Sequence, residues 1–209
     1  MNRKRRSHNS MGQTYFLIIK ERTPCAGFYD EACYQYYQLR LMNCLKAYQI
    51  KLHAYLLQPN EIWLLCTPIS LLALSSTVKY LAQAYSEYFN IRFGRRVKVW
   101  HGEPVCSLVR GDRMVLDCQK YIESTPLHNG LVSHAGVHRW SSYCTNAFSL
   151  KFQYLTAHRS YNDFLQGNDN SLHRYREYVA RRFKSSYYLY LQNKLQSGSA
   201  LIERVSNGP

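Results

Sequence analysis

Hydrophobic and polar residues alternate in several short segments of this chain that are rich in β-forming side chains. A period of two places every second side chain on the same face, which is the pattern of a strand. The predicted strands are residues 13–20, 50–57, 61–67 and a part of 97–109 that is broken at Gly102 and Pro104. Because Pro59-Asn60 marks a tight connection, we expect the second and third strands to pair.

Apolar residues recur at helical spacing in the segments between and after these strands. The predicted helices are residues 30–49, 70–93, 112–125, 161–165, 172–183 and 185–195. Asp30 and Asp112 are expected to cap the first and third helices. Gly94 is expected to end the second helix, and the third should stop before Pro126.

The order strand, helix, two strands, helix, strand, helix predicts an α+β fold, an antiparallel β-sheet backed by helices on one face. The 209 residues, of which 46% are hydrophobic, suffice for one substantial core. The predicted division is a basic flexible arm at 1–11, a main domain at 12–145, a C-terminal helical extension at 146–196 and a flexible tail at 197–209.

The chain is strongly basic. Lys and Arg number 27 against 13 acidic residues, which gives a net charge of +14. Such an excess favours a polyanionic partner, because basic side chains that neutralise phosphates release counterions. The alternative is a basic surface whose charge serves only solubility.

The seven cysteines are scattered and contain no C-x-x-C pair, which argues against both a disulfide framework and a zinc cluster. Reduced thiols are typical of a cytoplasmic protein. No apolar run approaches the length of a membrane-spanning helix, so no membrane partner is expected.

One segment carries the most specific information. Residues 53–68 read HAYLLQPNEIWLLCTP. Further motifs follow in the segments 92–95 (RFGR), 99–102 (VWHG), 107–109 (SLV), 120–126 (KYIESTP), 130–132 (GLV), 140–143 (WSSY) and 155–158 (LTAH). In this order they resemble the motifs of the REP-associated tyrosine transposases, a single-tyrosine HUH transposase (IS200-like) family. There the first segment reads roughly H-A-Y-V-L-M-P-N-H-V-H-L-L-L-T-P.

The resemblance implies a ferredoxin-like HUH scaffold and a DNA-nicking site. Two histidines on one strand of such enzymes bind a divalent metal, and a tyrosine attacks the scissile phosphate to form a 5′-phosphotyrosine. That nucleophile maps to Tyr121, and a further polar ligand maps to Thr125. The two histidine positions hold Glu61 and Trp63, so the motif is degenerate.

These replacements change the expected chemistry. The carboxylate of Glu61 could still bind Mg²⁺ or Mn²⁺, but Trp63 offers no ligand and Thr125 is a poorer one than the family's usual Asn. We therefore expect no resident cofactor, and Mg²⁺ or Mn²⁺ only if the altered site is active. Trp63 either fills the space of the metal or stacks on an extruded base. Tyr121 is either a packed residue, a DNA contact or a nucleophile.

Basic residues are the expected DNA-binding surface, with a solvated charged face as the alternative for each. The candidates are Arg92, Arg95, Arg96, Lys98, Arg110, Arg113 and Lys120.

Three functions follow as hypotheses. The first is a transposase-derived protein that binds hairpin, palindromic or single-stranded DNA, lacks nicking and acts as a regulator, in the cytoplasm at the nucleoid, as a monomer or homodimer. The second is an active single-tyrosine transposase or nickase that uses Tyr121 and Glu61. The third is a basic module that binds an acidic protein or a nucleotide ligand.

Overall fold

The computed structural model describes residues 12–24, 26–150, 154–166 and 170–203. Its elements are β1 (Thr14–Lys20), α1 (Glu31–Ala47), β2 (Lys51–Leu57), β3 (Glu61–Thr67), α2 (Leu71–Phe93), β4 (Val105–Arg110), α3 (Asp112–His128), a 3-10 turn (Ala135–Val137), α4 (Tyr143–Phe148), α5 (Arg159–Leu165), α6 (Ser171–Ala180), α7 (Ser185–Gln196) and β5 (Leu201–Ile202). The predicted basic arm at 1–11 lies outside the described residues.

The sheet has the strand order β2-β3-β1-β4-β5, and all neighbours are antiparallel except β4 and β5. Its first part, β-α-β-β-α-β, is the ferredoxin-like arrangement. The register places Trp63 of β3 opposite Ile18 of β1. The prediction of an α+β fold with a sheet backed by helices is therefore confirmed.

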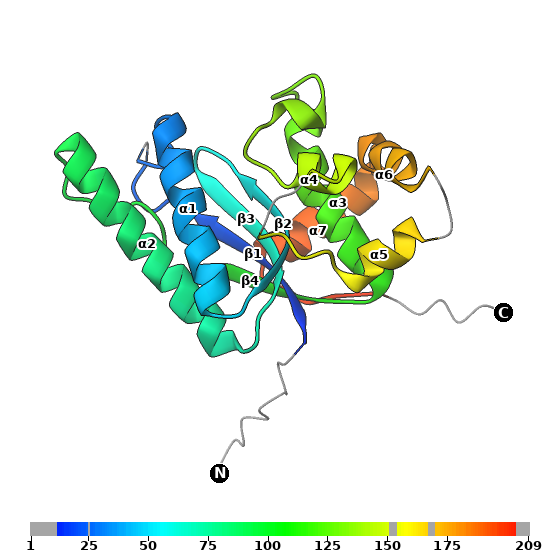
Figure 1. Ribbon diagram of the computed structural model, residues 1–209, viewed down its shortest axis with the longest axis horizontal. Helices are drawn as coiled ribbons and strands as arrows, with labels where there is room; N and C mark the ends of the chain where they lie inside the picture. The colour runs from blue at the N-terminus through cyan, green and yellow to red at the C-terminus, as the bar shows by residue number, and fades with distance from the viewer. Residues whose placement is uncertain (1–11, 25, 151–153, 167–169, 204–209) are drawn as a thin grey trace, which may run out of the picture.

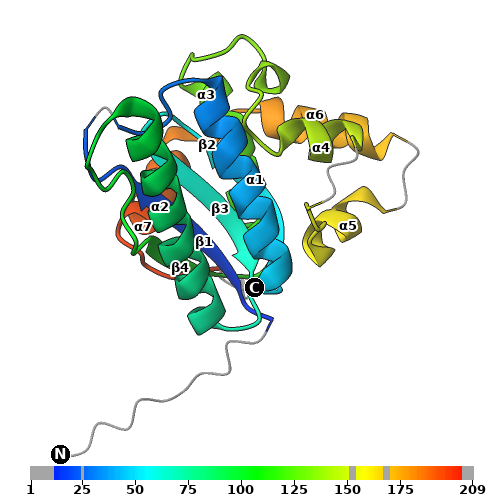
Figure 2. The same cartoon turned by 60° about the vertical axis from the view of Figure 1, so that its left-hand side comes forward.

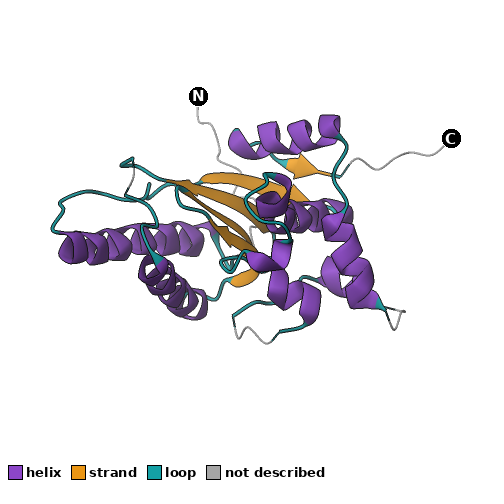
Figure 3. Cartoon of the chain, turned by 90° about the horizontal axis from the view of Figure 1, so that it is seen from above, coloured by secondary structure: helices purple, strands orange, loops and turns teal. Residues whose placement is uncertain are grey.

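Helices cover both faces of the sheet, so the prediction of a single covered face was wrong (Figures 1 and 3). Leu17 and Ile19 pack with residues of α1 and α2, whereas Phe16 and Ile18 pack with residues of α3 and α7. The physical reason is visible in β1, which is apolar on both sides. A strand that is buried on both faces loses the alternation of a half-exposed strand.

A third cluster lies beyond α3, on the side away from α1 and α2 (Figure 1), and Figure 2 shows α4, α5 and α6 on the other side of α1 from α2. There Leu116 of α3 packs with Tyr143 of α4, Tyr161 of α5 and Tyr175 of α6. These helices form a layer of their own around α3. The predicted boundary near residue 145 stays a prediction, and α7 joins the same core as β1 and β3.

Local capping signals place the first two helices as predicted. The Asp30 side chain accepts a hydrogen bond from the Cys33 amide at the start of α1. Ser70 does the same for the Ala73 amide at the start of α2. Gly94 ends α2 with φ of 63°, the left-handed conformation that glycine adopts without steric cost.

The third helix differs from its prediction at both ends. Gly111, rather than Asp112, occupies the N-cap, and α3 continues through Pro126 to His128. Residues 114–126 are all buried. Packing on nearly every side therefore outweighs the preference of the residue before a proline for extended backbone. The fifth predicted helix, which is α6, also differs, since it ends at Ala180 rather than at residue 183.

The predicted flexible tail is partly a strand. Leu201 and Ile202 pair in parallel with Val109 and Arg110 of β4, and the Leu201 side chain is fully buried. Burial of an aliphatic side chain and ladder hydrogen bonds hold this segment on the sheet. Residues 204–209 of the predicted tail lie outside the described residues.

Within the described parts of the chain, no helix is long and apolar enough to cross a membrane. Six cysteines are free thiols there, and Cys25 lies outside the described residues.

Candidate functional site

Glu61 and Trp63 lie at the start of β3, on the sheet face that α3 covers. Alternate residues of a strand point to the same side, so Glu61 and Trp63 share a face while Ile62 packs into the opposite core. Trp63 is buried and Glu61 is half-buried at the end of the strand. The two side chains therefore lie next to each other on one face of β3.

Trp63 fills the space between the sheet and α3. Its ring lies parallel to that of Tyr121, with centroids 5.2 Å apart and planes inclined by 10°. Phe16 of β1 flanks both rings, at centroid distances of 6.0 Å and 6.3 Å. The Trp63 Nε1–H donates a hydrogen bond to Glu61 Oε2 at 2.8 Å. The face of the indole therefore packs against Tyr121, and its N–H edge is hydrogen-bonded to Glu61.

Tyr121 stands on α3 where the resemblance expects a nucleophile, but its surroundings oppose that role. Only 2% of the residue is exposed. Burial raises the pKa of its hydroxyl well above the usual range, and the neighbouring Tyr188 and Glu61 raise it further. A tyrosine nucleophile must lose its proton, so each of these effects weakens it.

Thr125 is one turn beyond Tyr121 on the same helix and is also buried. Its hydroxyl donates a 2.6 Å hydrogen bond to the main-chain oxygen of Tyr121. Such a bond to the preceding turn is a common way for a helical threonine to satisfy its side chain. It turns the hydroxyl toward the helix backbone rather than toward Glu61.

The donor set does not fit the metal site that the resemblance implies. The Glu61 carboxylate is engaged by Trp63, and Thr125 is engaged by its own helix. The described residues contain no group of three or more His, Cys, Asp or Glu side chains placed to hold a metal ion. Glu61 and Thr125 are therefore not free to act as the ligands of such a metal.

His53, in the same motif segment, has a structural position. Its Nδ1 is 2.7 Å from the main-chain oxygen of Thr156, and its Nε2 is 2.9 Å from the Thr67 hydroxyl. Burial lowers the pKa of this imidazole to about 4, so the ring is neutral near pH 7. His53 therefore ties the segment after α4 to the sheet.

The structure divides the predicted DNA-binding residues into separate groups. Arg95, Arg96 and Lys98 follow α2 closely, are exposed, and have no acidic partner at ion-pair distance among the described residues. Arg92 is nearby, but its guanidinium forms a 2.6 Å ion pair with Asp30. Arg110 is exposed at the far end of β4.

The two candidates on α3 are engaged within the protein. Arg113 is exposed, but its Nε donates to both carboxylate oxygens of Asp117 at 3.2 Å. Lys120 is only 4% exposed. Its ammonium lies 4.6 Å from the Tyr178 ring centroid and 4.3 Å from that of Phe183. Burial lowers the pKa of Lys120 to about 8. Because these rings cover its ammonium, Lys120 does not belong to the exposed basic surface.

Sequence reasoning missed two cations. Arg22, from the loop after β1, and Lys79, from α2, line a pocket together with Lys98. They are far apart in the chain, and neither belongs to a charge run. Only the tertiary fold places them at one pocket.

Comparison with known proteins finds similarity at the level of the fold. No family model matches the chain, and no curated protein matches it. A solved structure of a REP-associated tyrosine transposase bound to a REP hairpin is similar, with a TM-score of 0.53 and 13% sequence identity. The match covers 76% of this chain and 99% of the other. This protein therefore shares the fold of that hairpin-bound transposase.

Proposed function

We propose that this protein binds DNA that carries a hairpin or a single-stranded segment, and that it does so without metal-dependent nicking. The fold it shares with a hairpin-bound transposase supports the DNA partner, as does its net charge of +14. The exposed cations Arg95 and Arg96 supply phosphate contacts.

The observation that supports the proposed lack of nicking is the stacking of Trp63 on Tyr121. In the resembled enzymes this region holds a metal and the scissile phosphate. Here an indole occupies it, and the candidate nucleophile is buried behind that indole. A protein that keeps DNA binding without cleavage is suited to act as a regulator at its sites, and we propose that role.

The test uses labelled single-stranded hairpins from the DNA that flanks the gene. Protein is incubated with each hairpin and Mg²⁺ or Mn²⁺, and the products are separated on native and denaturing gels. We expect a native shift, and no nick or covalent product. A scrambled strand of equal length and composition is the control for structure, and Tyr121→Phe is the control for chemistry.

Other results separate the alternatives. A denaturant-resistant adduct that Tyr121→Phe abolishes would establish an active nickase and overturn the proposed loss of chemistry. Equal affinity for hairpin and scrambled strand would overturn hairpin recognition. No DNA shift at all would favour a module that binds an acidic protein or a nucleotide.

A further inference from the structure

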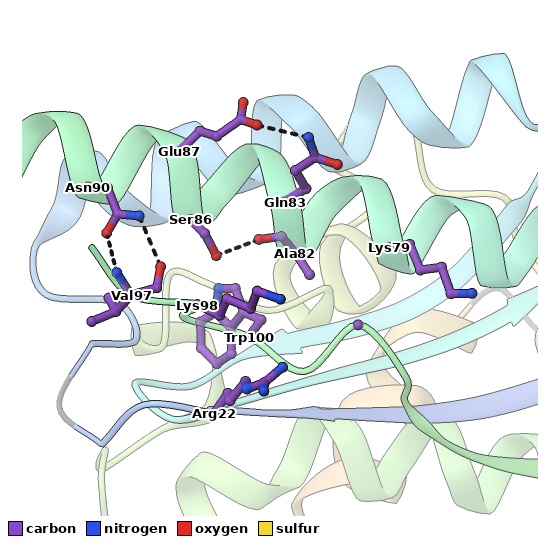
Figure 4. Close-up of a pocket in the computed structure, with 11 residues that line it drawn as sticks. Arg22, Lys79, Ala82, Gln83, Ser86, Glu87, Asn90, Val97, Lys98 and Trp100 are labelled. Carbon is purple, nitrogen blue, oxygen red and sulfur yellow. Dashed lines mark hydrogen bonds between the residues drawn. The ribbon is translucent and has the colours of Figure 1, made fainter. Parts of the chain in front are cut away.

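A pocket of about 420 Å³ lies between α2 and the segment 97–102, on the opposite side of the sheet from Trp63 and Tyr121 (Figure 4). Arg22, from the loop after β1, borders it from the strand side. Its volume is within the range of small-molecule sites. The pocket is thus separate from the altered motif.

Three cations line this pocket. Arg22, Lys79 and Lys98 are all exposed, and none has an acidic partner at ion-pair distance among the described residues. Glu87 is the one acidic lining residue, and its carboxylate accepts a 2.9 Å hydrogen bond from Gln83. Unpaired cations around one cavity favour an anionic ligand, and phosphate is the anion such side chains bind in nucleic acids.

Trp100 contributes an independent signal. The residue is 2% exposed, and its indole N–H has no hydrogen-bond partner among the described residues. A buried donor without a partner destabilises a protein, and most buried polar groups in proteins have one. Because Trp100 lines the pocket, a ligand oxygen that reaches the indole would satisfy this donor.

The walls of the pocket are held in place by hydrogen bonds. Ser86 on α2 accepts from the Val99 amide at 3.0 Å and donates to the Ala82 main-chain oxygen at 2.7 Å. Asn90 makes two 3.0 Å hydrogen bonds with the main chain of Val97 (Figure 4). A preformed cavity loses little entropy on binding, which favours recognition over adventitious contact.

We propose that this pocket receives one nucleotide of the DNA strand that flanks the hairpin. Arg22, Lys79 and Lys98 hold its phosphate, and the apolar wall of Ala82 and Trp100 packs against its sugar or base. This inference rests on the proposed DNA binding. A free nucleotide offers the same phosphate chemistry, so the test includes it.

The first test compares two labelled hairpins, one with a single-stranded flank of about six nucleotides and one without, by fluorescence anisotropy at several salt concentrations. We expect Lys79→Gln/Lys98→Gln to weaken binding of the flanked hairpin about tenfold. The log–log salt slope should become shallower by about 0.7, the value for one neutralised phosphate of a single strand. Binding of the unflanked hairpin should change no more than in the control.

The matched control is Lys46→Gln/Lys51→Gln. It removes two exposed lysines at the end of α1 and the start of β2, an edge strand far from β4 in the strand order. If the pocket variant and this control have the same effect on both hairpins, the pocket assignment is wrong although DNA binding stands.

Trp100→Phe tests the unpartnered donor separately. The substitution removes the N–H but breaks no hydrogen bond within the described protein. It also keeps an aromatic ring in the core. We expect a lower ratio of flanked to unflanked affinity, a readout that a general loss of stability would not move. An unchanged ratio would remove Trp100 from the binding site.

Free deoxynucleotide monophosphate is titrated in parallel, with thermal unfolding as the readout. If the wild type binds no DNA but is stabilised by the free nucleotide, and the Lys79→Gln/Lys98→Gln variant is not, the strand assignment is overturned together with the proposed function. Failure of the pocket variant alone leaves the proposed function intact, so the two failures are distinguishable.

Discussion

Trp63 and Tyr121 stack face to face across the space between β3 and α3, with ring centroids 5.2 Å apart. The resemblance maps the first to the position of a metal-binding histidine and the second to the nucleophile. Glu61 accepts a hydrogen bond from the indole N–H of Trp63, so Glu61, Trp63 and Tyr121 form one packed unit. A substitution at any of them is therefore expected to act on packing before it acts on chemistry.

Replacing Trp63 should show that it is part of the core. Removal of a buried aromatic ring costs about 3–5 kcal/mol, so Trp63→Ala should lower the free energy of unfolding by that amount. Trp63→Phe keeps an aromatic ring but loses the hydrogen bond to Glu61, and about 1–2 kcal/mol is expected from that loss and the smaller ring. Denaturant titration measures both values. A Trp63→Ala variant as stable as the wild type would contradict the packing role.

Tyr121→Phe should leave DNA affinity unchanged. The hydroxyl is buried and its raised pKa keeps it protonated, so it is in no position to contact a phosphate. Anisotropy titration of a labelled hairpin with the wild type and the variant tests this expectation. A severalfold loss of affinity, with an unchanged circular dichroism spectrum, would place the hydroxyl at the DNA.

Glu123 should make stability depend on pH. Its carboxyl is fully buried and accepts hydrogen bonds from Ser142, Asn146 and Tyr175 at 2.6–2.7 Å. Burial raises its pKa from 4.5 to about 7, and the hydrogen bonds only partly oppose that shift. The folded state thus holds the proton more tightly than the unfolded state. The stability this provides is complete below pH 4.5 and is lost as pH rises through about 7.

The measurement compares wild type with Glu123→Gln, which cannot titrate. The free energy of unfolding of the wild type, relative to the variant, should fall between pH 4.5 and 7 by at most about 1.4 kcal/mol per pH unit. The difference is needed because His53, whose pKa is lowered, changes stability in the opposite direction in this range. A difference that does not vary with pH would show that folding does not raise the pKa of Glu123.

The exposed and the buried cations should behave differently toward DNA. For a footprint of about six phosphates on a single strand, the log–log salt slope is about −4 to −5. Arg95→Gln/Arg96→Gln should make this slope shallower by about 0.7 for each phosphate that is no longer neutralised. Lys120→Met keeps the aliphatic stem of a buried lysine and should leave the slope unchanged. The reverse order of effects would contradict this division of the basic residues.

Leu201→Ala should destabilise the protein although it lies close to the C-terminal end of the chain. Its side chain is fully buried beside α7 and β4, and truncation of such a leucine costs about 2–5 kcal/mol. Ile202→Ala is the matched control, because Ile202 is half exposed on the same strand. Equal and negligible effects of both would show that β5 does not hold its place in solution.

One feature that was predicted wrongly, the covering of the sheet, has a visible signal in the sequence. The uninterrupted apolar run of β1 indicates burial on both faces, which the expectation of a one-sided sheet overlooked. Lys120 carried no such signal. A lysine next to a tyrosine in a helix looks like a surface residue, and only the packing of α6 and the segment before α7 over α3 buries it.

The sequence by itself determined the early strands and helices, the cap at Asp30, the end of α2 at Gly94, and the positions of Glu61 and Trp63 two residues apart on one strand. These features depend on local periodicity and on hydrogen bonds between near neighbours in the chain. The tertiary structure decided the stacking of Trp63 on Tyr121 and the convergence of Arg22 and Lys98 on one pocket. Such contacts join residues far apart in sequence, so they exist only once the sheet and its two layers of helices have packed.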